Sequence, residues 1–356
     1  ITTELLNWGA TPWLTDINAC DGLVGQILQA STNVKPFYDV TIQLQLPNEW
    51  NPFLGKVNIG ITAAVETDSC NPEWINCVNR MQMVIVPSEF TKSVFLTTAG
   101  TKVPTTPIFV VPESFPDAME DSRASVLDID FETSFNFLVF GQLTGNNTDN
   151  DRKNIPYTIK WLAETFAGRD DVGVVLKTNM GRQTHMDRTV CTNVFNKLLA
   201  EVGALAAGPR FYLLHGDMTE SEIAGLARHP KIKASVSLTH GEGFGLPLLE
   251  AAACGLPVIA TDWSAHTEFL GLGKYIKIES SLAQIHQSRA DNQIFMPTAK
   301  WAMPSEADAK RKLQKFYESP SIPKEWALDL KNKIQTKYNF AAISQHYNSV
   351  LGPILT

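Results

Sequence analysis

The chain has 356 residues, of which 44% are hydrophobic and 19% charged, so its composition is that of a folded protein and not of a disordered one. A formal net charge of −7 argues against a general electrostatic attraction to nucleic acid or to anionic lipid. No apolar run approaches the roughly 20 residues that span a bilayer. The length is sufficient for two domains of ordinary size.

The five cysteines are widely spaced and form no Cys-x-x-Cys pair. This odd, scattered set favours reduced and buried thiols in a cytoplasmic protein. The first residues, Ile1 to Glu4, lack the basic start and the apolar core of a signal peptide. We therefore expect a cytoplasmic location and no membrane span.

The first part of the chain alternates predicted strands and helices. Strands are expected at residues 3–9, 40–46, 57–64, 83–86 and 108–111, which are apolar runs or alternate between apolar and polar residues. Helices are expected at 21–30, after Asn71-Pro72 and after Pro87-Ser88. This alternation predicts a parallel sheet, and the acidic segment 117–132 that follows predicts an interdomain linker.

The second part repeats the alternation. Strands are expected at 135–140, 172–176, 211–214, 232–238 and 256–261, and helices at 156–166, 190–202, 219–228 and 248–254. Thr219 and Glu222 have the spacing of a capping box, which supports the third of these helices. Five strands and four helices predict a second doubly wound domain, followed by closing helices at 324–337 and 341–351.

The stretch from Ser237 to Asp262 has the layout of half a nucleotide-binding unit. A predicted buried strand leads into a loop with three alternate glycines, and Pro247 then suits the first turn of a helix. That helix is expected to stop at Gly255, before the next strand. A helix N-terminus with open glycines attracts phosphate, because its unpaired N–H groups and its dipole both point there.

Two carboxylates lie in this stretch, Glu242 in the loop and Glu250 in the helix. A carboxylate does not suit a phosphate, but each of its oxygens can accept a hydrogen bond from one of two neighbouring hydroxyls. The pattern therefore suits a ligand with phosphate in the middle and a hydroxyl-rich group at each end. A nucleotide sugar has this shape.

The same residues carry a family resemblance. Glu242-Gly-Phe-Gly-Leu-Pro-x-x-Glu250, followed by Ala-x-Ala-x-Gly-x-Pro-Val-Ile-Ala-Thr, closely resembles the signature of family-4 retaining glycosyltransferases with the GT-B fold, the group 1 glycosyltransferases. A second match, Ile61-Thr-x-x-x-Glu66-Thr-Asp, then Pro72-x-Trp and Val86-Pro-Ser-x-Phe, resembles the N-terminal half of a subset of these enzymes. The patterns around Glu66 and Arg152 are similar to those of glycosyltransferases found in bacteriophages.

The resemblance implies an α/β protein of GT-B architecture, with two Rossmann-like doubly wound domains that face a central cleft. Residues 1–130 would form the acceptor-side domain and residues 131–340 the nucleotide-sugar-binding domain, with a last helix at 341–356 packing back on the first domain. Gly22 and Gly25 would fit the glycine-rich loop that faces the cleft in such enzymes, or equally the start of an ordinary helix.

The resemblance also implies roles in the donor site. Glu250 would bind the ribose hydroxyls, Glu242 would lie close to the transferred sugar, and Lys153 would neutralise the diphosphate. The glycine loop would offer backbone N–H groups to the phosphates from Gly243, Phe244, Gly245 and Leu246. The turn at Gly216, after the third strand of the second domain, would lie near the base.

One position departs from the family pattern. Gln142 stands where an arginine usually binds the diphosphate, so we expect Arg152 or Lys177 to take its place. On the acceptor side, Glu66 or Asp68 is the candidate to contact the acceptor or to assist catalysis. A carboxylate that caps the helix near Pro72 explains this acidic pair equally well.

The predicted function is therefore transfer of a sugar, with retention, from a UDP- or GDP-linked donor such as UDP-glucose. No metal motif is evident, and no cofactor beyond the donor is expected. The acceptor could be a glycan, a lipid-linked sugar, a small molecule, a protein or a hydroxymethylated DNA base, although the net charge does not favour DNA. A nucleotide-sugar 2-epimerase and a non-catalytic nucleotide-sugar binder remain alternatives, which turnover of the donor without acceptor, or binding without turnover, would indicate.

Overall fold

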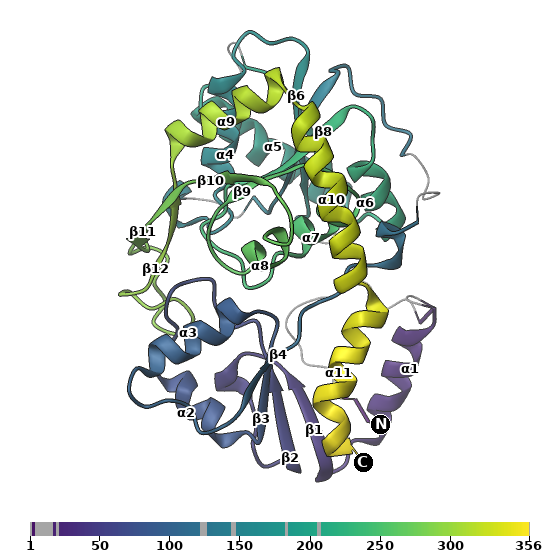
Figure 1. Cartoon of the computed structure of the whole chain (residues 1–356), viewed down its shortest axis with the longest axis vertical. Helices are drawn as coiled ribbons and strands as arrows, with labels where there is room; N and C mark the ends of the chain where they lie inside the picture. The colour runs from purple at the N-terminus through teal and green to yellow at the C-terminus, as the bar shows by residue number, and fades with distance from the viewer. Residues whose placement is uncertain are drawn as a thin grey trace.

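The computed structural model describes residues 2–3, 17–18, 21–121, 127–143, 147–181, 184–204 and 208–355. The strand predicted at residues 3–9 lies almost wholly outside them. The described elements form two parallel sheets with helices around each, one from each half of the chain (Figure 1). The predicted α/β class is confirmed.

The N-terminal sheet has the strand order β1-β2-β3-β4, and all its neighbours pair in parallel. Its elements are α1 (Leu23–Ala30), β1 (Tyr38–Leu44), β2 (Gly55–Ile61), α2 (Glu73–Arg80), β3 (Met83–Val86), α3 (Glu89–Ala99) and β4 (Ile108–Val110), with short 3-10 turns at Ser31–Asn33, Pro47–Glu49 and Asp117–Met119. Strand β3 is buried at every residue, which explains its uninterrupted apolar sequence. The Ser88 hydroxyl caps α3 by accepting a hydrogen bond from the Thr91 N–H.

The C-terminal sheet has six parallel strands in the order β10-β9-β8-β5-β6-β7. Its elements are β5 (Phe135–Phe140), α4 (Ile155–Thr165), β6 (Val172–Thr178), α5 (His185–Glu201), β7 (Arg210–His215), α6 (Glu220–Ala227), β8 (Ile232–Ser237), α7 (Leu246–Ala253), β9 (Val258–Thr261), α8 (His266–Leu270), β10 (Ile276–Ile278) and α9 (Glu306–Glu318), with a 3-10 turn at Thr148–Asn150. The chain moves outward from β5 to β7 and then returns to the other side of β5 with β8. Ligands of such sheets bind at this switch point, beyond the carboxyl ends of the strands.

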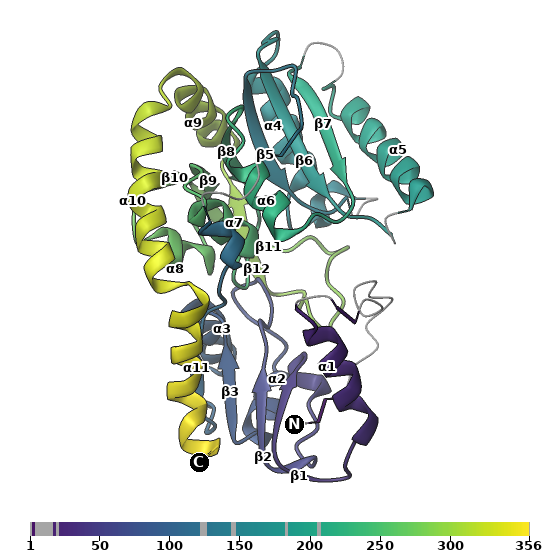
Figure 2. The same ribbon diagram turned by 90° about the vertical axis from the view of Figure 1, so that its right-hand side faces the viewer.

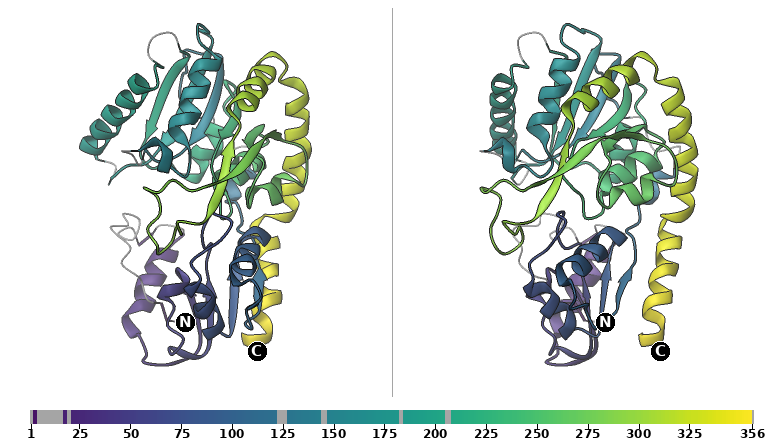
Figure 3. Two further views of the ribbon diagram at one scale, coloured as in Figure 1. Left: turned by 90° about the vertical axis from the view of Figure 1, so that its left-hand side faces the viewer. Right: turned by 60° about the vertical axis from the view of Figure 1, so that its left-hand side comes forward.

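Two features of this half were missed by the sequence analysis. Strand β10 extends the sheet from five predicted strands to six, and an antiparallel hairpin, β11 (Ser280–Gln284) and β12 (Lys300–Pro304), follows it. These strands are short, and β11 is largely polar, so they lack a clear periodic signal. Figure 3 shows the hairpin reaching from the C-terminal sheet towards the N-terminal half.

The last two helices connect the halves. Helix α10 (Ser321–Lys337) packs against α7, and α11 (Phe340–Leu355) continues along the N-terminal sheet, as Figures 1 and 2 show in yellow. Ile343 of α11 lies in a buried cluster with Ile59 and Ile85. The end of the chain thus covers a face of the sheet formed near its beginning.

The predicted linker, residues 117–132, is partly docked on the C-terminal half. Met119 lies in the core beside α7, and the Arg228 guanidinium donates to the carbonyls of Ala118 (3.2 Å) and Asp121 (2.6 Å). The division at residue 130/131 stays a prediction.

Of the described helices, none is long and apolar enough to cross a membrane. Cys70, Cys77, Cys191 and Cys254 are free thiols.

Candidate functional site

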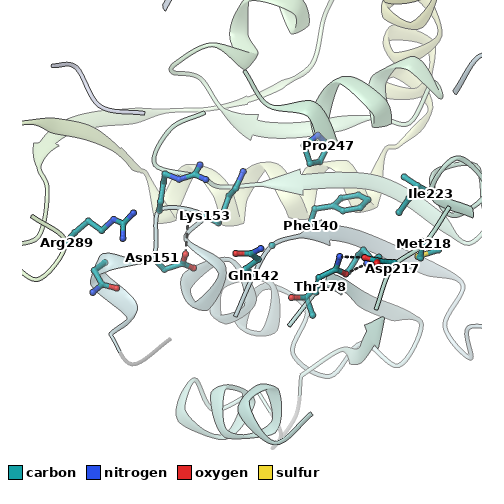
Figure 4. A pocket seen from close by; sticks show the side chains of 15 residues that line it. Phe140, Gln142, Asp151, Lys153, Thr178, Asp217, Met218, Ile223, Pro247 and Arg289 are labelled. Carbon is teal, nitrogen blue, oxygen red and sulfur yellow. Dashed lines mark hydrogen bonds between the residues drawn. The ribbon is translucent and has the colours of Figure 1, made fainter. Parts of the chain in front are cut away.

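A cavity of about 710 Å³ opens beyond the carboxyl ends of β5, β6 and β7 (Figure 4). The loop before α4 and the first turn of α7 contribute to its wall, so it lies at the switch point of the sheet. It is lined by Phe140, Gly141, Gln142, Asn150, Asp151, Arg152, Lys153, Lys177, Thr178, Asn179, Asp217, Met218, Ile223, Pro247 and Arg289. Four of these side chains are cationic and two are carboxylates, which favours an anionic ligand.

The glycine loop between β8 and α7 packs tightly against the loop that follows β2. A Cβ on Gly241 would lie 2.4 Å from the carbonyl oxygen of Glu66, and a Cβ on Gly243 would lie 3.0 Å from that of Ala63. The Gly243 carbonyl also accepts a hydrogen bond from the Ser88 hydroxyl, at 2.9 Å. These glycines therefore allow the two halves of the chain to meet at the site.

Gly245 begins helix α7 in the left-handed conformation, with a φ of 101°. The helix starts at Leu246, two residues earlier than predicted, and Pro247 lies in its first turn. The first N–H groups of a helix have no acceptor within the helix and carry its positive dipole end. In this way, the loop and Pro247 present an N-terminal helix end beside the cavity.

An ion-pair cluster joins the glycine loop to the start of α4. The Lys153 ammonium donates to both oxygens of Glu242, at 2.6 and 2.7 Å, and Glu242 is buried. The Arg152 guanidinium lies 3.2 Å from a carboxylate oxygen of Glu66 and 3.5 Å from one of Glu242. The structure thus brings together four predicted site residues from three separate loops.

Burial and neighbouring charges act in opposite directions on the two acids of this cluster. Burial alone would raise the pKa of Glu242, but Lys153 and Arg152 together hold it below its ordinary value. Burial raises the pKa of Glu66, and Arg152 offsets only part of that effect. Glu242 is therefore held in its ionised form, whereas Glu66 keeps its proton to a higher pH than an ordinary glutamate does.

His266, which the sequence analysis did not identify, packs against the glycine loop at Gly245. Its Cβ lies 3.0 Å from the place where a Cβ on Gly245 would stand. Its Nε2 lies 2.7 Å from the Thr261 carbonyl oxygen, and Ser264 next to it accepts the Glu242 N–H at 2.9 Å. Burial lowers the pKa of His266, so the ring is neutral and fixes the loop rather than carrying charge.

Lys177 and Gly216 meet at the other end of the cavity. The Lys177 ammonium donates to the carbonyl oxygen of Gly216 at 2.5 Å and to Oδ1 of Asn179 at 2.7 Å. Burial lowers the pKa of Lys177. Gly216 has a φ of 114°, which a residue with a side chain rarely adopts. Lys177 therefore holds the turn after β7 in place.

Glu250 lies one turn further along α7 than Pro247 and is not among the residues that line the cavity. Burial, together with the nearby Glu220 on α6, raises the pKa of Glu250 to about 7. No hydrogen bond to its carboxylate occurs within the described ranges. A carboxyl group in this state has the capacity to accept hydroxyl hydrogen bonds once it ionises.

The Asp68 carboxylate does not join the ion-pair cluster but binds the main chain of Lys300. It accepts the Lys300 N–H at 2.7 Å, and the Asp68 N–H donates to the Lys300 carbonyl oxygen at 2.8 Å. This pair of bonds ties the loop after β2 to strand β12. Of the two predicted acids on this side, Glu66 is the one that reaches the ion-pair cluster.

Several cavity residues have no counterpart in the sequence analysis, among them Asp151, Asp217 and Arg289. Asp151 accepts the N–H groups of Lys153 and Ile155 and so caps the first turn of α4. No motif marks Arg289, because it lies in the loop of the hairpin that the sequence did not predict. Gln142 does line the cavity, as its family position implies.

Gly22 and Gly25 do not line the cavity; Gly22 directly precedes α1 in a left-handed conformation, and Gly25 lies within that helix. In the part of the chain that the structure describes, no group of three or more His, Cys, Asp or Glu side chains is placed to hold a metal ion.

The sequence matches the family of glycosyl transferases group 1 over residues 197–286, a range that contains the glycine loop and helix α7. No curated protein matches the sequence significantly.

Solved structures with the same architecture include the pneumococcal O-GlcNAc transferase GtfA in complex with UDP and GlcNAc. Its TM-score is 0.57 at 14% identity, and the match covers 85% of this chain and 53% of that one. Another is TarM of S. aureus in complex with UDP, with a TM-score of 0.58, 14% identity and coverage of 92% and 58%. A UDP-forming α,α-trehalose-phosphate synthase from Burkholderia xenovorans has a TM-score of 0.62 at 10% identity, with coverage of 94% and 77%.

These identities are low, so the structural similarities show the fold alone, and the chain spans little more than half the length of GtfA and TarM. The predicted GT-B architecture is nevertheless confirmed, and the family match falls on the stretch whose motif predicted it. The protein therefore has the GT-B fold, and its residues 197–286 match the family of glycosyl transferases group 1.

Proposed function

We propose that this protein is a retaining glycosyltransferase that moves a hexosyl group from a nucleoside diphosphate sugar to an acceptor hydroxyl. The observation that carries the proposal is the Lys153–Glu242 pair, at 2.6 Å, which lies beside the N-terminus of α7 and whose lysine lines the cavity. An ammonium group and a helix N-terminus together suit the diphosphate of the donor.

The leaving group of this reaction gains negative charge as the glycosidic bond breaks. Lys153, Arg152 and the first turn of α7 would stabilise that charge in the transition state, which is the form of catalysis that a fixed cationic site supplies best. Glu242 holds Lys153 in place, and the resemblance implies that it would lie close to the transferred sugar. Glu250 would accept the ribose hydroxyls.

Glu66 comes from the N-terminal half and faces this cluster across Arg152. Burial raises the pKa of Glu66, and a carboxyl group with a raised pKa is a better proton acceptor for a hydroxyl than an ordinary glutamate is. We assign Glu66 to the acceptor side, where it would orient or activate the acceptor. The complexes of GtfA and TarM with UDP, and the UDP-forming trehalose-phosphate synthase, support UDP as the nucleotide.

A thermal-shift screen against UDP- and GDP-linked sugars tests the donor, because a bound ligand raises the apparent melting temperature by mass action. With the donor known, NMR of the anomeric proton tests the stereochemistry. We expect a product that keeps the donor's α configuration and an activity that EDTA does not abolish.

Three outcomes would overturn parts of this proposal. A β product would contradict retention, and a strict requirement for Mg²⁺ or Mn²⁺ would contradict the metal-independent mechanism. Conversion of the free donor to its epimer without acceptor would assign the protein to the isomerases instead.

A further inference from the structure

The loop of the β11–β12 hairpin, residues 285–299, is anchored to both halves of the molecule. Ile285 and Phe295 are buried in the core of the N-terminal half. The Asn71 side chain donates to the Gln293 carbonyl oxygen at 3.1 Å, and on the other side the Asn147 side chain donates to the Ser288 hydroxyl at 2.9 Å. Ser288 directly precedes Arg289, so these contacts fix the position of Arg289 at the cavity.

Arg289 is held by an aromatic ring and lacks a protein acceptor. Its guanidinium carbon lies 4.0 Å from the centroid of the Phe295 ring. Its Nε–H is shielded from solvent and meets no hydrogen-bond acceptor among the described residues. Asp291 attracts the guanidinium electrostatically, but Oδ1 of Asp291 already accepts the N–H groups of residues 293, 294 and 295, at 2.9, 2.7 and 2.9 Å.

Unlike Arg289, the other three cations of the cavity have acceptors within the protein. Lys153 donates to Glu242, Arg152 pairs with Glu66, and Lys177 donates to the turn at Gly216. Each of them therefore already makes a direct hydrogen bond or ion pair with the protein. Among the cavity cations of the described chain, Arg289 is the one whose guanidinium makes no hydrogen bond or ion pair with the protein.

The position of Arg289 points to the phosphate groups of that ligand. Arg289 and Lys153 lie towards one end of the cavity, whereas Thr178, Asp217 and Met218 lie towards the other (Figure 4). A planar guanidinium binds two phosphate oxygens at once, which an ammonium cannot do. The neutral Gln142 in the same wall supplies no positive charge.

We propose that Arg289 binds the diphosphate of the nucleotide donor and supplies the cation that position 142 lacks. The hairpin carries this arginine to the cavity only while Ile285 and Phe295 remain seated in the N-terminal core, so donor binding and the packing of the two halves are coupled. This inference rests on the proposed function, because it takes the ligand to be a nucleoside diphosphate.

Calorimetric titration of the whole chain with UDP and GDP, and with uridine and guanosine, tests the assignment. We expect Arg289→Gln to weaken binding of the accepted diphosphate roughly ten- to a hundredfold, the range for hydrogen bonds to a charged group. Its affinity for the corresponding nucleoside should stay unchanged, because a nucleoside has no phosphate. Arg289→Lys should lose less than Arg289→Gln, since it keeps the charge without the planar fork.

Lys300→Gln is the matched control, because it removes one positive charge from the same hairpin at an exposed position outside the cavity. It should leave diphosphate affinity within about twofold of the wild type, as expected for a screened surface charge. Equal diphosphate affinity in Arg289→Gln and the wild type would overturn the assignment of Arg289 to the diphosphate and would leave the proposed function standing. Equal losses for nucleoside and diphosphate would show a structural role instead. If the wild type bound neither UDP nor GDP, the proposed function would fail, and this inference with it.

Discussion

At the scale of single residues, the charge of the buried Glu242 carboxylate depends on its cationic neighbours. Its side chain is 8% exposed, and Lys153, which is 26% exposed, bonds both of its oxygens. A carboxylate in such surroundings loses much of its hydration, and only a partner charge offsets that cost. The stability of this loop therefore depends on the same pair to which we assign a role in catalysis.

Replacing Lys153 by Met should lower the free energy of unfolding by about 2–4 kcal/mol, because Glu242 is left with the longer contact to Arg152. The double change Lys153→Met with Glu242→Gln should recover most of this loss, since no buried charge remains. Urea denaturation measures both. The control is Lys160→Met on α4, which breaks an exposed pair with Glu164 at 3.9 Å and should cost under about 0.5 kcal/mol. A similar loss from both lysines would contradict the buried-charge argument.

The raised pKa of Glu250 predicts that the free energy of unfolding depends on pH. Its pKa is raised from 4.5 to about 7 in the folded chain, so the folded state binds the proton more tightly than the unfolded state does. The stabilising contribution is complete below about pH 4.5 and is lost as the pH rises through about 7. Relative to the wild type, Glu250→Gln should gain about 2 kcal/mol of unfolding free energy between about pH 5 and about pH 8. A pH-independent difference in urea denaturation would refute this.

Ligand binding should respond to the same carboxyl group in the opposite sense. Ribose hydroxyls donate to the ionised form, so nucleoside affinity should rise with pH through about 7 in the wild type and stay flat in Glu250→Gln. Glu250→Ala should weaken donor binding by about 1.5–3 kcal/mol. Calorimetry with a nucleoside avoids the titration of phosphate groups, and unchanged affinity in both variants would remove Glu250 from the site.

The element on which the site depends most is the glycine loop between β8 and α7. It carries Glu242, begins α7 and touches the loop after β2, so a change in its backbone moves all three. Its glycines are needed for close approach as much as for backbone freedom. A side chain on Gly241 would meet main-chain and ring atoms rather than the flexible end of a side chain.

Gly241→Ala should therefore lower the free energy of unfolding by about 1–3 kcal/mol, the usual cost of overpacking. Its Cβ would lie 2.4 Å from the Glu66 carbonyl oxygen and 2.9 Å from the Trp263 ring. Gly352→Ala is the control, because a Cβ there would meet no atom within 4 Å and Gly352 lies in helix α11. This control should gain about 0.5–1 kcal/mol in the same denaturation experiment. Destabilisation of both variants would argue against the close-contact explanation.

At the scale of the whole molecule, the C-terminal helices hold the N-terminal sheet and the C-terminal sheet in one structure. Helix α10 packs on α7, and α11 continues onto β2 and β3 through Ile343. The hairpin makes a second connection through Phe295. Contacts between residues far apart in the sequence therefore determine how the two sides of the site face each other.

Ile343→Ala should lower the free energy of unfolding by about 2–4 kcal/mol, as for other deletions of buried methyl groups. Ile343 is 6% exposed and contacts the face of the sheet that contains Ile59 and Ile85. Hydrogen exchange should accelerate in β2 and β3 more than in β5 and β6, because local stability follows local packing. Leu355→Ala, at a side chain that is 59% exposed, should change neither quantity. Uniform acceleration over both sheets would show that the halves unfold as one unit.

The sequence by itself determined most of the regular elements and the architecture. Strands β3 and β5 lie where the apolar runs predicted them, and Thr219 caps α6 as its spacing with Glu222 predicted. The Glu242-to-Glu250 pattern predicted the architecture, which the structure confirms. These successes share a cause, because periodicity, capping and glycine spacing are local properties that a short stretch of sequence contains in full.

Only the tertiary structure decided which charges meet. Nothing near Glu66 in the sequence indicates that it pairs with Arg152 whereas Asp68, two residues later, binds the main chain of Lys300. Arg289 reaches the cavity because its hairpin is packed between the two halves, and neither that hairpin nor its packing leaves a periodic signal. Ion pairs and cavities depend on the distances between loops, and those distances follow from the packing of the two sheets rather than from any single segment.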